Sequence, residues 1–166
     1  MVSEVQGDIV EFVEQFHQSN DGSKALFVIH QANCFNTVSR ARGVARVLAS
    51  YCPALGEVDD NTTKGDTTKL GGYSFAQKYN DVWIFNAYGQ YRYGNGKRTG
   101  EVFTDYAKLH ESLVAIRNSV ISHFPNPVFV MPKYIGAGLA NGDWNIILNE
   151  IIKPVFEGFE ITLVYL

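Results

Sequence analysis

Gly136, Gly138 and Gly142 lie between the apolar residues 128–131 and a helical pattern. Glycine adopts left-handed backbone angles and has no side chain, so successive N–H groups of such a turn can point at one anion near a helix N-terminus. Turns of this composition also serve simply to connect a strand to a helix, and the residues alone leave both roles open. The chemistry that this spacing suggests is the binding of a phosphate group.

A second polar loop of the same kind follows residues 25–29, whose length and composition predict a buried strand. It runs from His30 to Gly43, after which apolar residues recur with helical spacing over residues 43–51. Ligands of open α/β folds bind at the carboxyl ends of the strands. The two strand–loop–helix units therefore predict one shared anion site at that edge of the sheet.

The bulk composition predicts one ordinary domain over residues 1–166. The chain has 166 residues, of which 46% are hydrophobic, enough for a real core. Cys34 and Cys52 have no CxxC spacing and are interpreted as reduced thiols, with a catalytic role for Cys34 the weaker alternative. No apolar run is long enough to span a bilayer, and the N-terminus lacks the pattern of a signal peptide. We therefore expect a cytoplasmic protein without membrane partner, metal site or cofactor.

The charge of the chain argues against a general nucleic-acid-binding protein, which needs a basic face. The net charge is −3 and the sequence pI is about 5.8. Two local basic clusters lie in loops beside the predicted anion site, where they indicate a phosphorylated small molecule as partner. They consist of Arg40, Arg42 and Arg46, and of Arg92, Lys97 and Arg98.

Hydrophobic patterns predict strands and helices in alternation. The predicted strands cover residues 5–9, 25–29, 71–76, 81–88, 128–131 and 161–165, with a hairpin turn over residues 77–80. The predicted helices cover residues 10–16, 43–51, 102–124 and 145–156, the last interrupted near Pro154. Residues 56–70 and 88–100 are predicted loops, the second mobile and too rich in glycine for a helix. Right-handed crossovers then give a three-layer α/β/α sandwich with a mixed central sheet.

An ordered set of short motifs resembles the macrodomain family over nearly the whole chain. Each motif is unspecific alone, whereas their order and spacing are specific. The set is similar in particular to the branch that processes ADP-ribose-1″-phosphate. The motifs are Gly7-Asp8-Ile9, His30-x-Ala32-Asn33-Cys34, Gly43-Val44-Ala45, Ile84-Phe85-Asn86, Ile135-Gly136-Ala137-Gly138-Leu139 and Asp143-Trp144.

The resemblance implies a site for ADP-ribose or ADP-ribose-1″-phosphate. Asp8 matches the residue that accepts a hydrogen bond from the adenine amino group, and the backbone of Ile9 helps to fix the base. Asn33 matches the residue that holds the distal ribose. From the residues alone, Asp8 would be a turn residue and Asn33 a capping residue. The diphosphate is expected between a first loop with Gly43, Val44 and Ala45 and a second loop with Ile135, Gly136, Ala137, Gly138 and Leu139.

The resemblance also implies candidates for catalysis. His30 occupies the place of a histidine of the phosphatase branch, and Asp143 follows the second loop, where an acid can face the distal ribose. A neutral histidine and a nearby carboxylate can supply the base and the acid that cleavage of a 1″-phosphate needs. The alternatives are a hydrogen-bonded structural histidine and an N-cap of the last helix.

The chain departs from the family pattern in and around the first loop. Residues 39–42 are bulkier and more basic than a glycine-rich loop, which puts the usual diphosphate or distal-ribose pose in question. Relatives that act on nucleic acid can use a lysine where Arg42 stands, and a guanidinium cannot replace an amine nucleophile. Relatives that cleave glutamyl-linked ADP-ribose pair a lysine near Gln90 with an aspartate near Ala140, and neither is present.

Three functions compete on this basis. The leading expectation is an enzyme that binds ADP-ribose and hydrolyses ADP-ribose-1″-phosphate to ADP-ribose and phosphate. The second is a binding module without turnover, because every recognition element is present while no catalytic set is unmistakable. The third is a hydrolase that removes ADP-ribose from a macromolecule, which the missing lysines disfavour.

Overall fold

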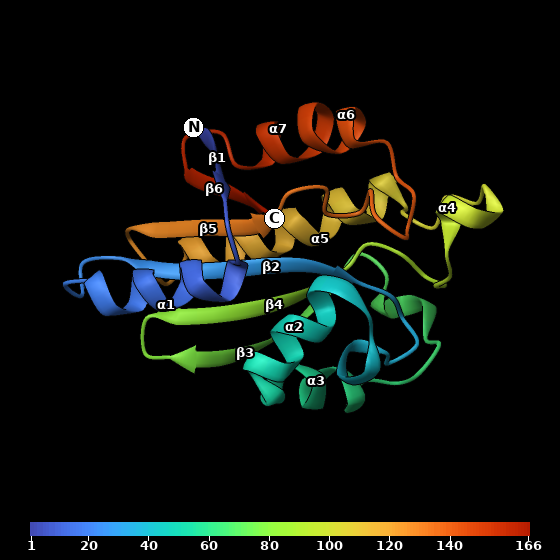
Figure 1. Ribbon diagram of the computed structural model, residues 1–166, viewed down its shortest axis with the longest axis horizontal. Coiled ribbons are helices and arrows are strands. Elements are labelled where there is room, and N and C mark those ends of the chain that lie inside the picture. The colour runs from blue at the N-terminus through green and yellow to red at the C-terminus, as the bar shows by residue number, and fades with distance from the viewer.

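The computed structural model describes residues 1–166 and contains a six-stranded mixed sheet. The strand order is β1-β6-β5-β2-β4-β3, and every neighbouring pair is parallel except the antiparallel hairpin β3–β4. Figure 1 shows the strands side by side, with β3 at one margin and β1 at the other. The strands are β1 (Val2–Gln6), β2 (Ala25–Ala32), β3 (Tyr73–Tyr79), β4 (Val82–Tyr88), β5 (Pro127–Pro132) and β6 (Glu160–Tyr165).

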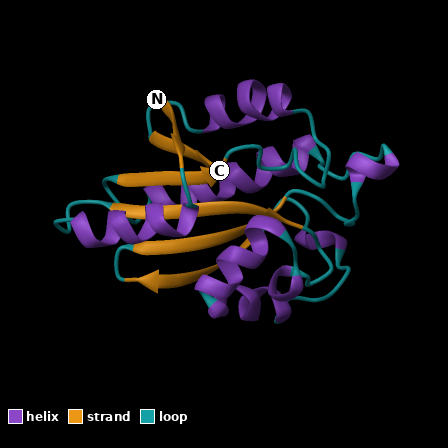
Figure 2. Cartoon of the chain, viewed as in Figure 1, coloured by secondary structure: helices purple, strands orange, loops and turns teal.

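Helices cover both faces of this sheet (Figure 2). Leu26 and Val28 of β2 point to one face and pack in a cluster with α1, α2 and α3, whereas Phe27 and Ile29 point to the other and pack with α5 and the helices of residues 144–155. The expected three-layer α/β/α sandwich with a mixed sheet is confirmed. The helices are α1 (Ile9–Ser19), α2 (Gly43–Tyr51), α3 (Pro53–Asp60), α4 (Gly96–Thr99), α5 (Tyr106–Ile121), α6 (Trp144–Ile146) and α7 (Lys153–Val155), with 3-10 turns η1 (Val38–Arg40) and η2 (Thr67–Lys69) and the π-helix η3 (Ile147–Ile152).

Several predicted boundaries were wrong for identifiable reasons. The first strand covers Val2–Gln6 rather than residues 5–9, because Asp8 accepts hydrogen bonds from the backbone of Val10 and Glu11 and so begins α1. Residues 56–70 are not one loop, since α3 extends to Asp60 after Pro53 at its first turn.

Three further differences lie nearer the carboxyl ends of the strands. The segment 88–100 contains the short helix α4, capped by the Asn95 side chain, although glycines surround it. α5 begins at Tyr106 instead of residue 102 because Asp105 caps it. The helix of residues 144–155 is continuous but runs as a π-helix through Ile147–Ile152 before Pro154, which has no N–H to donate. No helix combines the length and the apolar composition that a membrane span requires.

A chain of polar groups interrupts the apolar core on the face covered by α3. The His30 imidazole donates from Nε2 to Asn86 Oδ1 (2.5 Å), and Asn86 Nδ2 donates to Leu55 O and Ser74 Oγ (3.2 and 3.0 Å). Beside it, Tyr88 donates its hydroxyl proton to the Asp59 carboxylate at 2.7 Å. Pairing of this kind is what makes buried polar groups tolerable.

Burial fixes the protonation state of His30. Its side chain is only 2% exposed, and desolvation lowers the pKa of the imidazole below its ordinary value, partly offset by the hydrogen bond to Asn86. The imidazole is therefore neutral at pH 7 in the folded protein.

This burial predicts a pH dependence of stability. Below about pH 6.5 the unfolded chain takes up a proton at His30 that the folded chain does not, so the free energy of unfolding falls by up to about 1.4 kcal/mol per pH unit. His30→Gln keeps an N–H donor toward Asn86 and removes the titrating group. Urea unfolding of the variant should show a shallower loss of stability with falling pH than the wild type.

The matched control is His110→Gln on the exposed side of α5, which should keep the wild-type slope. Equal slopes for His30→Gln and the wild type would mean that His30 is not the source of the acid sensitivity.

Candidate functional site

The central strands separate at their carboxyl ends and leave a crevice there. β2 pairs with β5 only as far as Val28 and Val130, whereas its pairing with β4 continues to Ala32 and Tyr88. β5 meanwhile stays paired with β6 as far as Pro132. In open α/β sheets such a divergence is where ligands bind. The loops that follow β2, β4 and β5 all lie on this side, at the right of Figure 1.

The second loop, residues 133–143, offers unpaired backbone donors. Its course is fixed by left-handed angles at Tyr134 (φ 72°), Gly136 (φ 76°) and Asn141 (φ 60°). Ala137 N and Gly142 N are used inside the loop, since they donate to Tyr134 O and Gly136 O at 2.8 and 2.9 Å. The N–H groups that donate to no protein atom are those of Tyr134, Gly136, Gly138, Leu139 and Ala140. Such a series of free donors suits an anion.

Side chains beneath the second loop hold its first turn. Thr104 Oγ1 donates to Gly136 O at 2.6 Å and accepts from Gln31 Nε2 at 3.0 Å. Gln31 Nε2 also donates to Gln90 Oε1 at 2.8 Å, which links β2 to the segment after β4. Gln31 Oε1 is buried without a partner. The loop therefore rests on a polar floor of Gln31, Gln90 and Thr104.

The glycines of the second loop have different roles. A Cβ on Gly142 would lie 2.5 Å from Gly136 O, and one on Gly136 would lie 3.1 Å from Ile147 Cδ1 at a positive φ. A Cβ on Gly138 would meet nothing within 4 Å, and this residue is exposed. Gly136 and Gly142 are thus required by packing, while Gly138 faces open space.

The first loop, residues 33–42, is shaped by Asn33. Its Oδ1 accepts from Phe35 N at 2.8 Å and its Nδ2 donates to Thr37 Oγ1 at 2.6 Å, while the residue is 8% exposed. This is an Asx turn, the structural alternative for this residue. Asn33 lies at the crevice, and its amide already orders the loop that would hold a ribose.

Lys69 anchors the same loop, a role that no pattern in the sequence predicts. Its ammonium donates to Cys34 O (3.0 Å), Asn36 Oδ1 (2.7 Å) and Thr62 Oγ1 (2.7 Å). All three protons of the ammonium are used in this way. Asn36 has a left-handed φ of 57°, so the clamp also holds a backbone conformation that is uncommon outside glycine.

Helix α2 presents an uncapped N-terminus after the first loop. Arg42 precedes the helix without a side-chain cap, and Gly43 has a φ of 66°. The first N–H groups of a helix have no intrahelical acceptor, and the helix dipole favours an anion there. Gly43, Val44 and Ala45 thus form a second set of donors. Arg42 is exposed and pairs with no carboxylate.

Asp8 lies at the far end of the same edge. Oδ1 caps α1 through Val10 N (2.7 Å) and Glu11 N (3.2 Å), and Oδ2 has no protein partner. Gly7 N donates to Tyr165 O at 2.7 Å, which fixes the turn against the end of β6. Ile9 is buried at 6% exposure. One carboxylate oxygen of Asp8 is therefore available at the surface.

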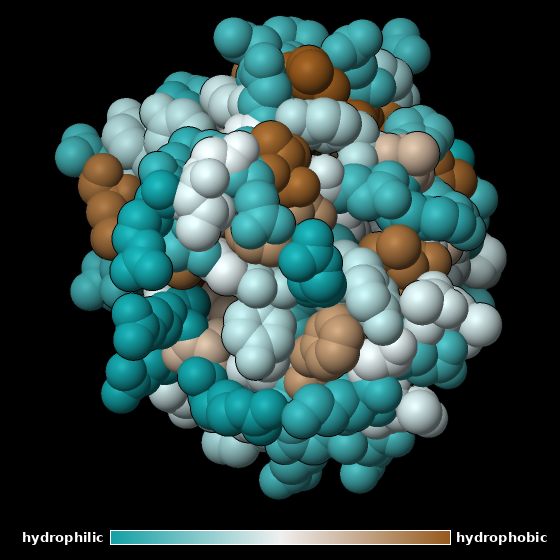
Figure 3. All heavy atoms as spheres, turned by 90° about the vertical axis from the view of Figure 1, so that its right-hand side faces the viewer, coloured by the Kyte–Doolittle hydropathy of each residue, from teal (hydrophilic) through white to brown (hydrophobic).

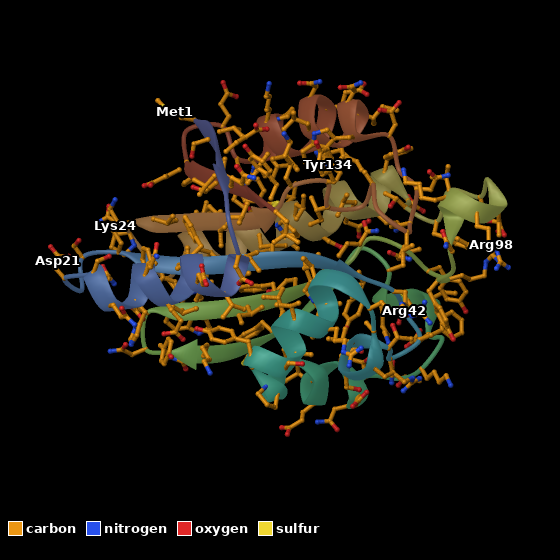
Figure 4. All side chains as sticks on the ribbon, viewed as in Figure 1. Met1, Asp21, Lys24, Arg42, Arg98 and Tyr134 are labelled. Carbon is orange, nitrogen blue, oxygen red and sulfur yellow. The ribbon has the colours of Figure 1, made fainter.

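A cation and two aromatic rings stand near this end of the crevice. Lys133 Nζ lies 5.2 Å from the ring centroid of Tyr134 and 4.9 Å from that of Tyr165. Its hydrogen bond to Glu4 raises the pKa of Lys133 above the ordinary value, so the ammonium stays charged. Tyr134, labelled in Figure 4, is half exposed. Its ring packs edge-on against Trp144.

His30 and Asp143 are not in contact with each other. His30 is enclosed beneath α3 as described above, on the sheet face opposite to Gln31. Asp143 lies exposed at the other end of the second loop, where Oδ1 caps α6 through Asn145 N at 2.9 Å and Oδ2 is unengaged. His30 is therefore a hydrogen-bonded structural histidine and Asp143 is an N-cap, which are the alternatives that the sequence left open.

Cys34 is sealed from solvent. Burial raises the pKa of the thiol, so it is not a thiolate at neutral pH.

The edge as a whole is a polar surface with apolar side chains between charged ones. Figure 3 looks onto it and shows hydrophilic groups around several hydrophobic patches. Two sets of backbone donors, with a free carboxylate oxygen at one end, suit an elongated ligand with a central anion. The sequence interpretation identified both loops, but it did not identify Lys69, Gln31 or Thr104. The alternation of β2 alone would have placed Gln31 on the α5 face.

Comparison with known proteins gives one relative in sequence and several in structure. No family model matches the chain. An uncharacterized 17.5 kDa protein of phage T4, from the tk–vs intergenic region, is 31% identical over 168 residues, covering 99% of this chain and 96% of that protein. This likeness is sufficient to place both in one family.

The structural relatives identify the architecture. A protein of unknown function from Bacteroides thetaiotaomicron has a TM-score of 0.78 at 22% identity, with 100% of this chain and 98% of that chain covered. The macrodomain of Mycobacterium tuberculosis DarG has a TM-score of 0.66 at 12% identity, with 99% and 97% covered. Thermosipho africanus DarTG, solved in complex with ADP-ribose, has a TM-score of 0.63 at 11% identity, with 98% of this chain and 52% of that one covered.

At 22% sequence identity or less, the solved structures establish the fold alone. The sequence identity with the phage protein establishes the family. The chain therefore belongs to the family of the phage T4 17.5 kDa protein, and its architecture is the macrodomain fold.

Proposed function

We propose that the protein binds ADP-ribose across the carboxyl edge of its sheet. The observation that carries this proposal is the pairing of two donor sets, the free N–H groups of the second loop and the uncapped N-terminus of α2. A diphosphate accepts hydrogen bonds on both sides and would use both sets. The macrodomain fold supports the same ligand, since the Thermosipho relative was solved with ADP-ribose.

The remaining residues fit the two ends of that ligand. The unengaged oxygen of Asp8 can accept a hydrogen bond from the adenine amino group, with the backbone of Ile9 beside it. Asn33 stands at the end where the distal ribose would lie, in a loop held rigid by Lys69. Ile135 and Ala137 are buried at 4% and 8% exposure and support the diphosphate segment from below. Calorimetric titration with ADP-ribose tests the proposal directly.

Hydrolysis of ADP-ribose-1″-phosphate is the second proposal, favoured by the free carboxylate oxygen of Asp143. Attack of one water on phosphorus would break the bond from phosphorus to the C1″ oxygen, giving ADP-ribose and inorganic phosphate. The Asp143 carboxylate would take the proton of the water, and solvent would protonate the sugar oxygen. His30 is enclosed, so its contribution would be to hold the end of β2 through Asn86 rather than to touch the substrate.

Removal of ADP-ribose from a macromolecule by a lysine after β4 is the least supported function. Gln90 stands in that region, and its amide is engaged by Gln31 and by the Arg92 carbonyl. An amide is not a nucleophile, so an ADP-ribosylated macromolecule would be bound rather than cleaved by that route.

The adenine assignment predicts the effect of Asp8→Ser. Serine still caps α1, so stability changes little, but it has no second oxygen for the base. Affinity for ADP-ribose should fall by about 1–3 kcal/mol in calorimetry. Asp105→Ser, at the N-cap of α5, is the matched control and should bind as the wild type does. Undiminished affinity of Asp8→Ser would remove the adenine site from this position.

The diphosphate assignment predicts the effect of Gly138→Val. Because the Cβ direction at this residue is open, the variant should fold normally, with its new side chain in the ligand space. Affinity for ADP-ribose should weaken by about 1–3 kcal/mol or more. Gly136→Val should instead lower the melting temperature, since its φ is positive and its surroundings are filled. A folded Gly138→Val protein with wild-type affinity would contradict the diphosphate assignment.

The catalytic assignment predicts the effect of Asp143→Asn on release of phosphate from ADP-ribose-1″-phosphate. Asparagine keeps the cap on α6 and loses the base. The rate should drop at least about tenfold, because general acid–base groups typically contribute ~10²–10⁴, while ADP-ribose affinity is retained. His30→Gln should affect the rate less than Asp143→Asn. Absence of phosphate release by a wild-type protein that binds ADP-ribose would leave the binding module as the function.

A further inference from the structure

The cations of this acidic protein that have no partner gather at one edge. Among the Lys and Arg side chains, several form neither a hydrogen bond nor an ion pair nor a contact with an aromatic ring. All of them except Lys153 lie in or next to the loops at the carboxyl edge. They are Arg40, Arg42, Arg46, Lys64, Lys97 and Arg98.

Several aromatic rings lie in the same loops as these cations. The Phe35 ring lies 5.0 Å from the Tyr91 ring and 6.2 Å from the Tyr93 ring, measured between centroids. The Arg92 guanidinium lies 5.6 Å above the Phe103 ring. Tyr93 is 59% exposed, an unusual position for an aromatic side chain that packs against another ring.

Hydrogen bonds tie the loops that carry these residues to one another. Tyr91 donates its hydroxyl to Gly65 O at 2.7 Å, next to Lys64, and accepts at its carbonyl from Cys34 N. At the other end, Gly96 N donates to Leu139 O at 2.8 Å, which fixes α4 to the second loop. In Figure 4 the Arg42 and Arg98 side chains project on the same side of the molecule.

We propose that this basic–aromatic track binds a single-stranded nucleic acid alongside the crevice. The track consists of the cations Arg40, Arg42, Lys64, Lys97 and Arg98 with the rings of Phe35, Tyr91, Tyr93 and Phe103. The inference goes beyond the proposed ADP-ribose function and uses side chains that the proposed ADP-ribose site does not.

The chemistry of the track favours this partner over other polyanions. A surface that carries both cations and rings matches a strand that carries both phosphates and bases, since every unstacked base offers a face to an aromatic ring. An acidic peptide would pair with the cations but leave the rings without a role. A duplex keeps its bases stacked, and a protein with a net charge of −3 has no broad basic face for it.

Fluorescence anisotropy with labelled oligo(dT) tests the track. Saturating ADP-ribose is included to occupy the crevice. The oligonucleotide should bind, with an affinity that falls as salt rises. Tyr93→Ala should weaken binding about tenfold, the lower part of the range for losing one base–aromatic stack. Arg98→Glu should weaken binding and flatten its salt dependence.

Matched controls separate the track from general charge effects. Lys153→Glu reverses an exposed, unpaired cation away from the track, changes the net charge as much as Arg98→Glu, and should bind like the wild type. All three variants should keep their ADP-ribose affinity in calorimetry, so failure of the track and failure of the ADP-ribose site are distinguishable.

Four outcomes would overturn the proposal. In the first the oligonucleotide does not bind, and in the second ADP-ribose displaces it. In the third Lys153→Glu and Arg98→Glu lose the same affinity for the oligonucleotide. In the fourth Tyr93→Ala binds the oligonucleotide as the wild type does, and polyglutamate competes with the oligonucleotide equally well for both proteins.

Discussion

The parallel pairing of β2 with both β4 and β5 is the constraint on which the site depends. Parallel hydrogen bonding brings the following loops to one edge, and the earlier end of the β2–β5 ladder opens the crevice between them. A register slip of one residue would turn Gln31 toward α3 and remove the floor of the second loop. The position of every donor at the edge therefore follows from the ladder at Val28 and Val130.

The two loops at this edge are ordered by different physical means. The first depends on polar side chains, because the Asn33 turn and the Lys69 ammonium tie it to its own residues and to Thr62. The second depends on its backbone, with left-handed angles and internal hydrogen bonds from Ala137 to Tyr134, from Asn141 to Gly138 and from Gly142 to Gly136. A ligand between them would thus meet two preorganised walls, and little conformational entropy would be lost on binding.

The sequence predicted what depends on local pattern and missed what depends on distant partners. The alternation of apolar residues gave the hairpin and most strands, and α2 covers Gly43–Tyr51 as expected. The enclosure of His30 requires α3, and the loop expected over residues 56–70 had included the second part of that helix. Lys69 binds atoms of Cys34 and Asn36, more than thirty positions away in the chain, and no local sequence pattern predicts such a contact. The first loop was recognised because it lies between a buried strand and a helical pattern, and the second also because residues with positive backbone angles are often glycine.

The unequal surroundings of the glycines in the second loop bear on how this family could diversify. Gly136 and Gly142 cannot accept a side chain without displacing Ile147 or the Gly136 carbonyl, so a substitution at either position would destabilise the folded protein. Gly138 and the half-exposed Leu139 are free of that restriction. Changes of ligand preference among descendants of this chain would therefore accumulate at these two positions, on a scaffold that stays the same.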